Sequence, residues 1–217
     1  MRAAQCLILM IVLFSTAFVN AQFRNAWTRP PAVTVIYSDK DERIGLVEEA
    51  IAFWNKTFEE IGSGFRLPNA SIVKKVVPES DLQALSLPMV AGDRSAEFPD
   101  AFRELPGDLN IFLGNSEFVS FATPFDQNGK RVVGIRGTKF PPFTLPNVAR
   151  NVIIHEIGHS IGLGHNSDPA MLMCGRPAPC RPNLFNSAEP KIFPLTAAEK
   201  RQLLLMYPSD WRSKARP

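Results

Sequence analysis

Histidine and cysteine are both scarce in this chain of 217 residues, which contains three of each. Long runs of Lys or Arg are also missing, and the formal charge of +3 falls by one to +2 without residues 1–21, where Arg2 is the one charged side chain. This composition does not indicate the basic surface that nucleic-acid-binding proteins carry, and we expect no nucleic-acid partner. Beyond residue 21 the apolar runs are short and interrupted, so we expect no stable insertion into a membrane.

The first 21 residues have the pattern of a secretory signal peptide. Arg2 provides a positive start, residues 6–18 are apolar, and residues 19–21 form a small-residue cleavage site. An uncleaved membrane anchor is the alternative, but the apolar stretch is shorter than the roughly 20 residues that span a bilayer. We therefore predict cleavage after Ala21, a secreted or otherwise extracytoplasmic protein, and a single domain at residues 22–217.

Loss of the signal would leave only two cysteines, Cys174 and Cys180, because Cys6 lies within the signal. Nearby cysteines in exported proteins are commonly bridged, and the short Gly-Arg-Pro-Ala-Pro segment between these two can bring the sulfur atoms together. We predict a Cys174–Cys180 disulfide.

The spacing of apolar and β-branched residues predicts an α+β domain in which strands cluster early, with a long first helix, a later helix that carries the chemistry and a C-terminal helix. Strands are expected at residues 33–38, 71–77, 109–113, 118–123 and 131–137, and helices at 44–61, 147–161 and 197–206. Residues 78–106, which mix short helix-like stretches with Pro and Gly, are expected to be irregular, and the sequence assigns them no function.

Residues 126–129, Asp-Gln-Asn-Gly, form the connection between the last two expected strands. Their Asn-Gly pair is typical of a tight hairpin turn. The oxygen atoms could also bind calcium, but the rest of a calcium loop is missing, so we favour the plain turn.

The three histidines of the chain all lie within eleven residues, in the run His155-Glu156-Ile-Gly-His159-Ser-Ile-Gly162-Leu-Gly-His165. His155 and His159 are four residues apart on an expected helix, which places both imidazoles on one face and about 6 Å apart along the axis. Gly162 can end the helix in a left-handed conformation, so that His165 can fold back as a third ligand.

Three neutral imidazoles leave one position of a tetrahedral Zn²⁺ open to water, as in catalytic sites and unlike closed structural sites. We therefore predict one catalytic Zn²⁺ on His155, His159 and His165. Zinc polarises a scissile carbonyl and lowers the pKa of bound water to about 7. Glu156 is predicted to be the general base, taking the proton of the zinc-bound water and passing it to the leaving amine.

The full H-E-x-x-H-x-x-G-x-x-H run, followed by Pro-Ala-Met-Leu-Met at residues 169–173, resembles the metzincin zinc metallopeptidases and their matrixin-like branch in particular. The resemblance implies a metzincin-like domain with a mostly twisted mixed sheet. It also implies a methionine turn beneath the zinc, and the matrixin spacing places that residue at Met173. Met171 is the other candidate, and both methionines could instead simply fill core space.

The same resemblance implies a substrate and its pocket. The expected strand at residues 118–123 would pair with an extended polypeptide substrate, and residues 174–195 would shape the pocket for the residue after the cleaved bond. Three features depart from the matrixin pattern. Asn166 follows the third histidine where matrixins commonly have Ser, no histidine remains for a second, structural zinc, and residues 22–32 hold no cysteine for a cysteine switch.

Taken together, the sequence predicts a secreted, monomeric zinc-dependent endopeptidase that hydrolyses internal peptide bonds of protein substrates. The alternative is a secreted zinc-binding protein that acts by binding a partner without catalysis. Glu156 favours the enzyme, because a binding protein needs no base beside its metal ligands. A purely structural zinc domain is disfavoured by the open coordination position.

Overall fold

The structure of the chain is a computed structural model that describes residues 26–91, 97–102, 104–126, 129–175, 180, 187 and 189–213. The predicted signal peptide lies outside these residues, as do parts of the predicted turn at 126–129 and of the segment 174–195. In the described part of the chain, no helix is both long and apolar enough to cross a bilayer.

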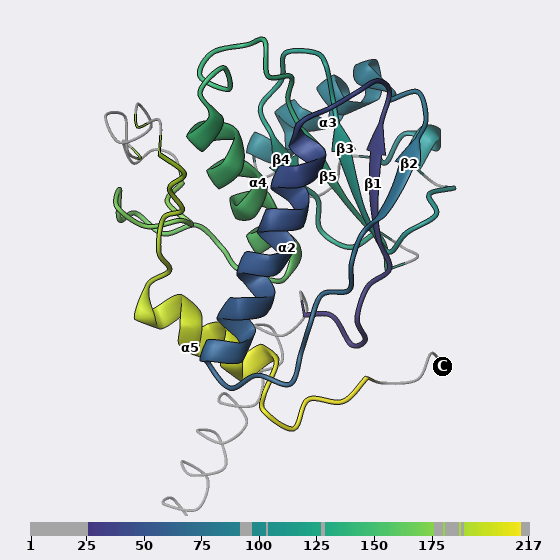
Figure 1. Cartoon of the computed structure of the whole chain (residues 1–217). Coiled ribbons are helices and arrows are strands. Elements are labelled where there is room, and N and C mark those ends of the chain that lie inside the picture. The colour runs from purple at the N-terminus through teal and green to yellow at the C-terminus, as the bar shows by residue number, and fades with distance from the viewer. Residues whose placement is uncertain are drawn as a thin grey trace, which may run out of the picture.

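A mixed sheet with strand order β2-β1-β3-β5-β4 forms the centre of the described fold (Figure 1). Its first four strands in this order run parallel, and β4 pairs with β5 in the antiparallel direction at the edge. The strands are β1 (Val33–Tyr37), β2 (Ser71–Lys74), β3 (Leu109–Leu113), β4 (Phe121–Ala122) and β5 (Arg131–Ile135). This mixed sheet and its helices confirm the predicted α+β class.

The central strands are buried on both faces. All five residues of β3 and of β5 are buried, and so are four of the five in β1. Such strands need apolar or well-paired residues at every position, which explains why Val, Ile and Leu make up most of their residues. The sheet therefore requires a layer of packed elements on each side.

Two long helices, α2 (Arg43–Glu60) and α4 (Pro146–Ser160), pack side by side on one face of the sheet, and α5 (Ala197–Met206) lies against the end of α2 (Figure 1). Trp54 of α2 is fully buried and donates its Nε1 hydrogen bond to the carbonyl of Ile154 in α4, at 3.0 Å. The large apolar core thus lies between these helices and the sheet, and it fixes α4 relative to β5.

The opposite face of the sheet is covered by α3 (Glu79–Ala91) and the short 3-10 helix η1 (Asp100–Phe102). Leu82 and Leu85 of α3 pack there in a second core with Ile36 and Phe112 of the strands. The prediction of an irregular segment at residues 78–106 was therefore wrong for α3. Its sequence contains Pro88, which usually stops a helix but here lies in its last turns.

Two strands are much shorter than expected, whereas β1 and β5 end only one and two residues early. The strand expected at residues 71–77 ends at Lys74, and the one expected at 118–123 is reduced to Phe121–Ala122. Val119 pairs with Ser86 of α3 instead of a strand, since its N–H donates to the Ser86 Oγ at 3.0 Å and its carbonyl accepts from the same hydroxyl at 2.8 Å.

The predicted Cys174–Cys180 disulfide is confirmed, with the two Cα atoms 5.8 Å apart.

Candidate metal centre

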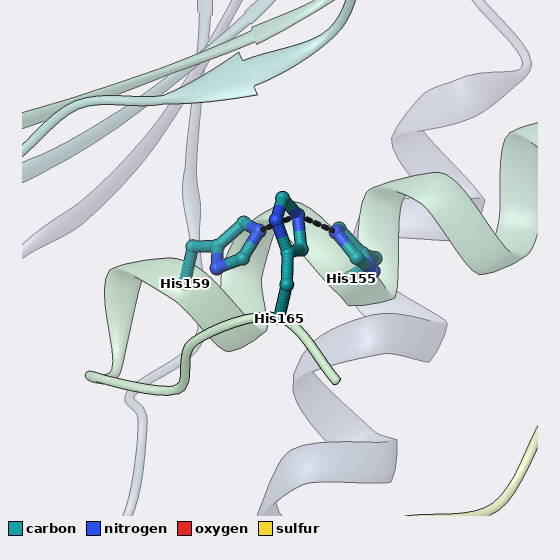
Figure 2. A group of neighbouring side chains, drawn as sticks. All are labelled: His155, His159 and His165. Carbon is teal, nitrogen blue, oxygen red and sulfur yellow. Dashed lines mark hydrogen bonds between the residues drawn. The ribbon is translucent and has the colours of Figure 1, made fainter. Parts of the chain in front are cut away.

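The three histidines converge at the end of α4 (Figure 2). His155 and His159 project from successive turns of this helix, and His165 reaches them from the loop that follows it. The Nε2 atom of His165 lies 3.0 Å from that of His159 and 3.2 Å from that of His155. The structure thus brings together the three residues that the sequence predicts as metal ligands.

The chain reversal between His159 and His165 is produced by the helix terminus. Gly162 has φ of 106°, in the left-handed region that favours glycine. Its N–H donates to the carbonyl of His159, and the N–H of Leu163 donates to that of Gly158, both at 3.0 Å. This pair of hydrogen bonds defines a Schellman motif, which satisfies the last carbonyls of the helix and turns the chain back toward its own end.

Hydrogen bonds to backbone carbonyls fix the two helical imidazoles. The Nδ1 atom of His155 lies 2.9 Å from the carbonyl oxygen of Leu172, and that of His159 lies 2.8 Å from the carbonyl oxygen of Leu163. A carbonyl oxygen only accepts, so each Nδ1 carries the proton and donates it. Each Nε2 of these two residues therefore presents a lone pair toward the other rings.

This geometry fits a tetrahedral zinc ion. With Zn–N bonds of 2.0–2.1 Å, two imidazole nitrogens on one tetrahedral ion lie about 3.3 Å apart. The Nε2 separations of 3.0 and 3.2 Å are close to that spacing. Outer hydrogen bonds from Nδ1 to carbonyl oxygens are also the usual way in which proteins orient metal-binding histidines. The donor set is therefore suited to zinc.

The surroundings of His159 and His165 favour their neutral form. Burial lowers the pKa of His159 to about 4, an effect to which the charge of Arg131 contributes, and partial desolvation lowers the pKa of the more exposed His165. At neutral pH these imidazoles are unprotonated, the form that binds a metal. The adjacent Glu156 is buried, and burial raises its pKa to about 8 in the metal-free chain.

Met173 lies beneath the turn of α4 that separates the two helical histidines. It is fully buried, whereas Met171 is partly exposed. A Cβ added at Gly158 would come 2.7 Å from the Met173 sulfur and 2.9 Å from a ring carbon of Trp54. The absence of a side chain at Gly158 thus lets Met173 pack directly against the helix backbone.

Arg131 is a buried cation at the end of α4 that the sequence did not single out. Its Nη1 donates to the carbonyl of His159 at 2.8 Å, and its guanidinium lies 3.8 Å from the ring centroid of Phe125. Burial lowers its pKa to about 10, so it stays charged at neutral pH. A cation is favourable at a helix C-terminus, where unpaired carbonyls concentrate negative charge.

Two buried asparagines share a spacing of four residues with the histidines on α4. The buried side chains of Asn147 and Asn151 hydrogen-bond to the backbone of residues 189–193, the returning segment. Asn151 Nδ2 donates to the Lys191 carbonyl at 2.7 Å, and its Oδ1 accepts from the Phe193 N–H at 2.9 Å. Polar residues recurring every four positions, at 147, 151, 155 and 159, were the sequence signal that could have revealed this role.

No protein-family model and no curated protein matches this chain. Among solved structures, the chain is similar to an archaemetzincin from Methanopyrus kandleri, with 16% identity over 79% of this chain and 93% of that one, and a TM-score of 0.37. It is likewise similar to a zinc-dependent peptidase from Methanocorpusculum labreanum, with 16% identity over 79% of this chain and 100% of that one, also at a TM-score of 0.37. At such low scores, function has to be judged on the geometry of the chain itself.

Proposed function

We propose that this protein is a zinc-dependent endopeptidase. The observation that carries the proposal is the convergence of three imidazole Nε2 atoms, two of them with their tautomers set by backbone carbonyls. Histidine accounts for all three ligands, which leaves a position of a tetrahedral ion open to solvent or substrate. His165 is exposed, so the open side is accessible from outside.

In this proposal His155, His159 and His165 hold the ion and Glu156 moves the proton. A bound Zn²⁺ acts as a Lewis acid toward a peptide carbonyl and lowers the pKa of water to about 7. Glu156 follows His155 directly and accepts a proton from the attacking water, then delivers it to the leaving amine. The raised pKa in the metal-free chain supports this role, because burial makes the carboxyl group hold a proton more readily, while a nearby dication would favour the carboxylate.

The sheet edge beside α4 supports a polypeptide as substrate. In the described sheet β4 is the terminal strand, and α4 contacts both β4 and β5. An edge strand offers unpaired backbone groups to which an extended peptide can add as a further strand. Such main-chain recognition suits an enzyme that cleaves internal peptide bonds.

A matrixin-like subtype is part of the proposal at a finer level. The matrixin-like spacing predicts Met173 as the residue of the methionine turn, and the packing of Met173 against Gly158 beneath the metal ligands supports that assignment. Asn166 in place of Ser remains a departure from the matrixin pattern.

We also propose that the protein is exported. The Cys174–Cys180 disulfide supports this, because disulfides persist mainly in oxidising compartments. Sequencing the N-terminus of the protein recovered outside the producing cells tests it. A mature chain beginning at Gln22 is expected, and a chain that stays reduced in the cytoplasm with Met1 in place would contradict it.

The proposed activity is tested by incubating the purified protein with a diverse peptide mixture and identifying products by mass spectrometry. Cleavage at internal bonds is expected with one zinc per chain, and removal of zinc by a chelator should abolish it until zinc is restored. Products that persist at the same rate in the chelated sample would contradict a zinc peptidase. A zinc-loaded protein that yields no products would favour the binding protein without catalysis.

A further inference from the structure

The third candidate ligand differs from the other two in its support. His155 and His159 are carried by α4, whereas His165 lies in the loop after the helix and is exposed. Its ring rests against Gly175, where an added Cβ would overlap the imidazole. The position of His165 therefore depends on how this loop is fixed to the segment around Gly175.

Asn166, the next residue, joins these two segments through its backbone. Its N–H donates to the carbonyl of Met173 at 2.9 Å, and its carbonyl accepts from the N–H of Gly175 at 3.0 Å. The bridge between Asn166 and Cys174 has the parallel geometry of a two-stranded ladder. The backbone of Asn166 thus joins the loop of His165 to residues 173–175, and the imidazole ring packs against Gly175.

The side chain of Asn166 connects the loop of His165 to the C-terminal helix α5. Its Oδ1 accepts from the N–H of Asp168 at 2.8 Å, and its Nδ2 donates to Glu199 Oε1 of α5 at 2.6 Å. Glu199 is buried, with 6% of its surface exposed. Its other oxygen, Oε2, accepts from the N–H of Thr196 at 2.7 Å as half of the capping box that begins α5.

Both carboxylate oxygens of Glu199 therefore accept hydrogen bonds, one from the Thr196 N–H at the start of α5 and one from the Asn166 amide in the loop of His165. A helix cap needs only the bond to Thr196, so the second bond is additional to the structural task of Glu199. Hydrogen bonds to a charged acceptor are about twice as strong as neutral ones, and a buried one has little competition from water. The Asn166–Glu199 pair is thus a firm attachment point for a loop that is otherwise exposed.

We propose that the hydrogen bond between Asn166 and Glu199 is a tether that positions His165 for the metal ion, so that both residues act as positioning residues of the site. The proposal rests on the proposed zinc site and assigns a role to two residues that are 33 positions apart. It explains what an asparagine contributes after the third histidine, because the amide accepts with one atom and donates with another, whereas serine offers a single hydroxyl on a shorter side chain.

The tether can be broken and rebuilt without changing side-chain size. Asn166→Asp keeps an oxygen for the Asp168 N–H but turns the donor toward Glu199 into a second carboxylate oxygen. Glu199→Gln added to it restores a donor and an acceptor in exchanged positions, with the oxygen of Gln still able to accept from Thr196. Thr196→Ala is the matched control, because it removes the side-chain half of the capping box and leaves the tether intact.

The measurement is zinc affinity by competition with a chromophoric chelator, together with the visible absorption of the Co²⁺-substituted protein, which reports ligand geometry. Loss of a group that hydrogen-bonds a metal ligand typically weakens metal binding by about 10–100-fold, and we expect a loss near the lower end of that range for Asn166→Asp, because its side chain holds the loop and does not bond the imidazole itself. The exchanged pair should regain most of the affinity and the Co²⁺ spectrum of the unmodified protein. Thr196→Ala should bind zinc as the unmodified protein does, although α5 is less stable.

Each other result overturns the proposal in a recognisable way. Equal affinity of Asn166→Asp and the unmodified protein would show that the tether does not position His165. No recovery in the exchanged pair, or an equal loss in Thr196→Ala, would assign the effect to general loosening of α5. If the unmodified protein itself fails to bind zinc, the proposed function falls first and the tether with it.

Discussion

Gly158 occupies the middle of the turn between His155 and His159, where α4 passes closest to Met173 and Trp54. The helix itself would be stabilised by alanine at this position, since glycine is a poor helix former. The surroundings reverse that preference, because a Cβ would lie 2.7 Å from the sulfur of Met173 and 2.9 Å from the ring of Trp54. Both neighbours are fully buried and have little room to move.

We predict that Gly158→Ala destabilises the protein by about 1–3 kcal/mol, the usual cost of overfilling a packed core. Gly164→Ala is the control within the same motif, because an added Cβ there meets no atom within 4 Å. Chemical denaturation of the two variants and the unmodified protein measures the difference. Equal destabilisation by both substitutions would mean that contact with Met173 and Trp54 is not the cause.

Glu156 gives the metal-free protein a distinctive pH dependence. Burial raises its pKa from 4.5 to about 8, so the folded state holds a proton that the unfolded chain releases. The resulting stabilisation is complete below pH 4.5 and is lost as the pH rises to about 8. Glu156→Gln, which is neutral at every pH, should lack this loss.

We therefore predict that the stability of Glu156→Gln relative to the unmodified protein rises between pH 5 and pH 8. The size of the pKa shift limits this gain in the free energy of unfolding to roughly a few kcal/mol. Denaturant unfolding in the presence of a chelator, at a series of pH values, measures the gain. The chelator matters because a bound dication favours the carboxylate and opposes the trend. Parallel pH profiles of the two proteins would contradict the prediction.

At the scale of single elements, α4 serves both the site and the architecture. Its positions 147, 151, 155 and 159 form one face, of which the first two hold a returning segment and the last two carry the imidazoles. The segment in turn supports the site, because the Pro194 carbonyl accepts from Leu172, whose own carbonyl accepts from the His155 ring.

Asn151→Ala is predicted to destabilise the protein by about 1–3 kcal/mol, because it leaves the buried N–H of Phe193 and the carbonyl of Lys191 without their side-chain partner. Lys200→Ala serves as the control, since the Lys200–Glu60 ion pair is exposed and 3.7 Å long, and such pairs contribute little. Thermal and denaturant unfolding measure both. A cost for Asn151→Ala no larger than that of Lys200→Ala would contradict this role.

The elements differ in how far the sequence could predict them. α2 and α5 follow from local signals, an apolar face with regular spacing in the first and a capping box in the second. α3 was missed because Pro88 argues against a helix locally, whereas packing of Leu82 and Leu85 on the sheet outweighs that cost. The short β4 could not be foreseen either, because its length depends on the Ser86–Val119 pair.

The candidate site, too, could be predicted only in part from the sequence. Its three histidines and Glu156 lie within one run of eleven residues, so spacing alone predicts which side chains meet. Their supports come from far along the chain: Leu172 for His155, Arg131 for the end of α4, and Glu199 for the loop of His165. Which backbone carbonyl faces an imidazole depends on tertiary packing, and a single sequence carries no local signal for it.

At the scale of the whole described molecule, the site lies where three parts of the fold meet. α4 is fixed to the sheet through the core and contacts the antiparallel edge strand β4, and α5 is attached to the loop of His165 by the Asn166–Glu199 hydrogen bond. We propose that this meeting point holds a catalytic zinc ion whose general base is Glu156.

That claim is tested most directly by comparing peptide hydrolysis by the unmodified protein and Glu156→Gln at equal zinc content. We predict that both bind one zinc per chain with similar affinity, and that the substitution lowers the rate of cleavage by about 10²–10⁴-fold, the usual contribution of a general base. Equal rates of cleavage by the two zinc-loaded proteins, or no cleavage by either of them, would contradict the account.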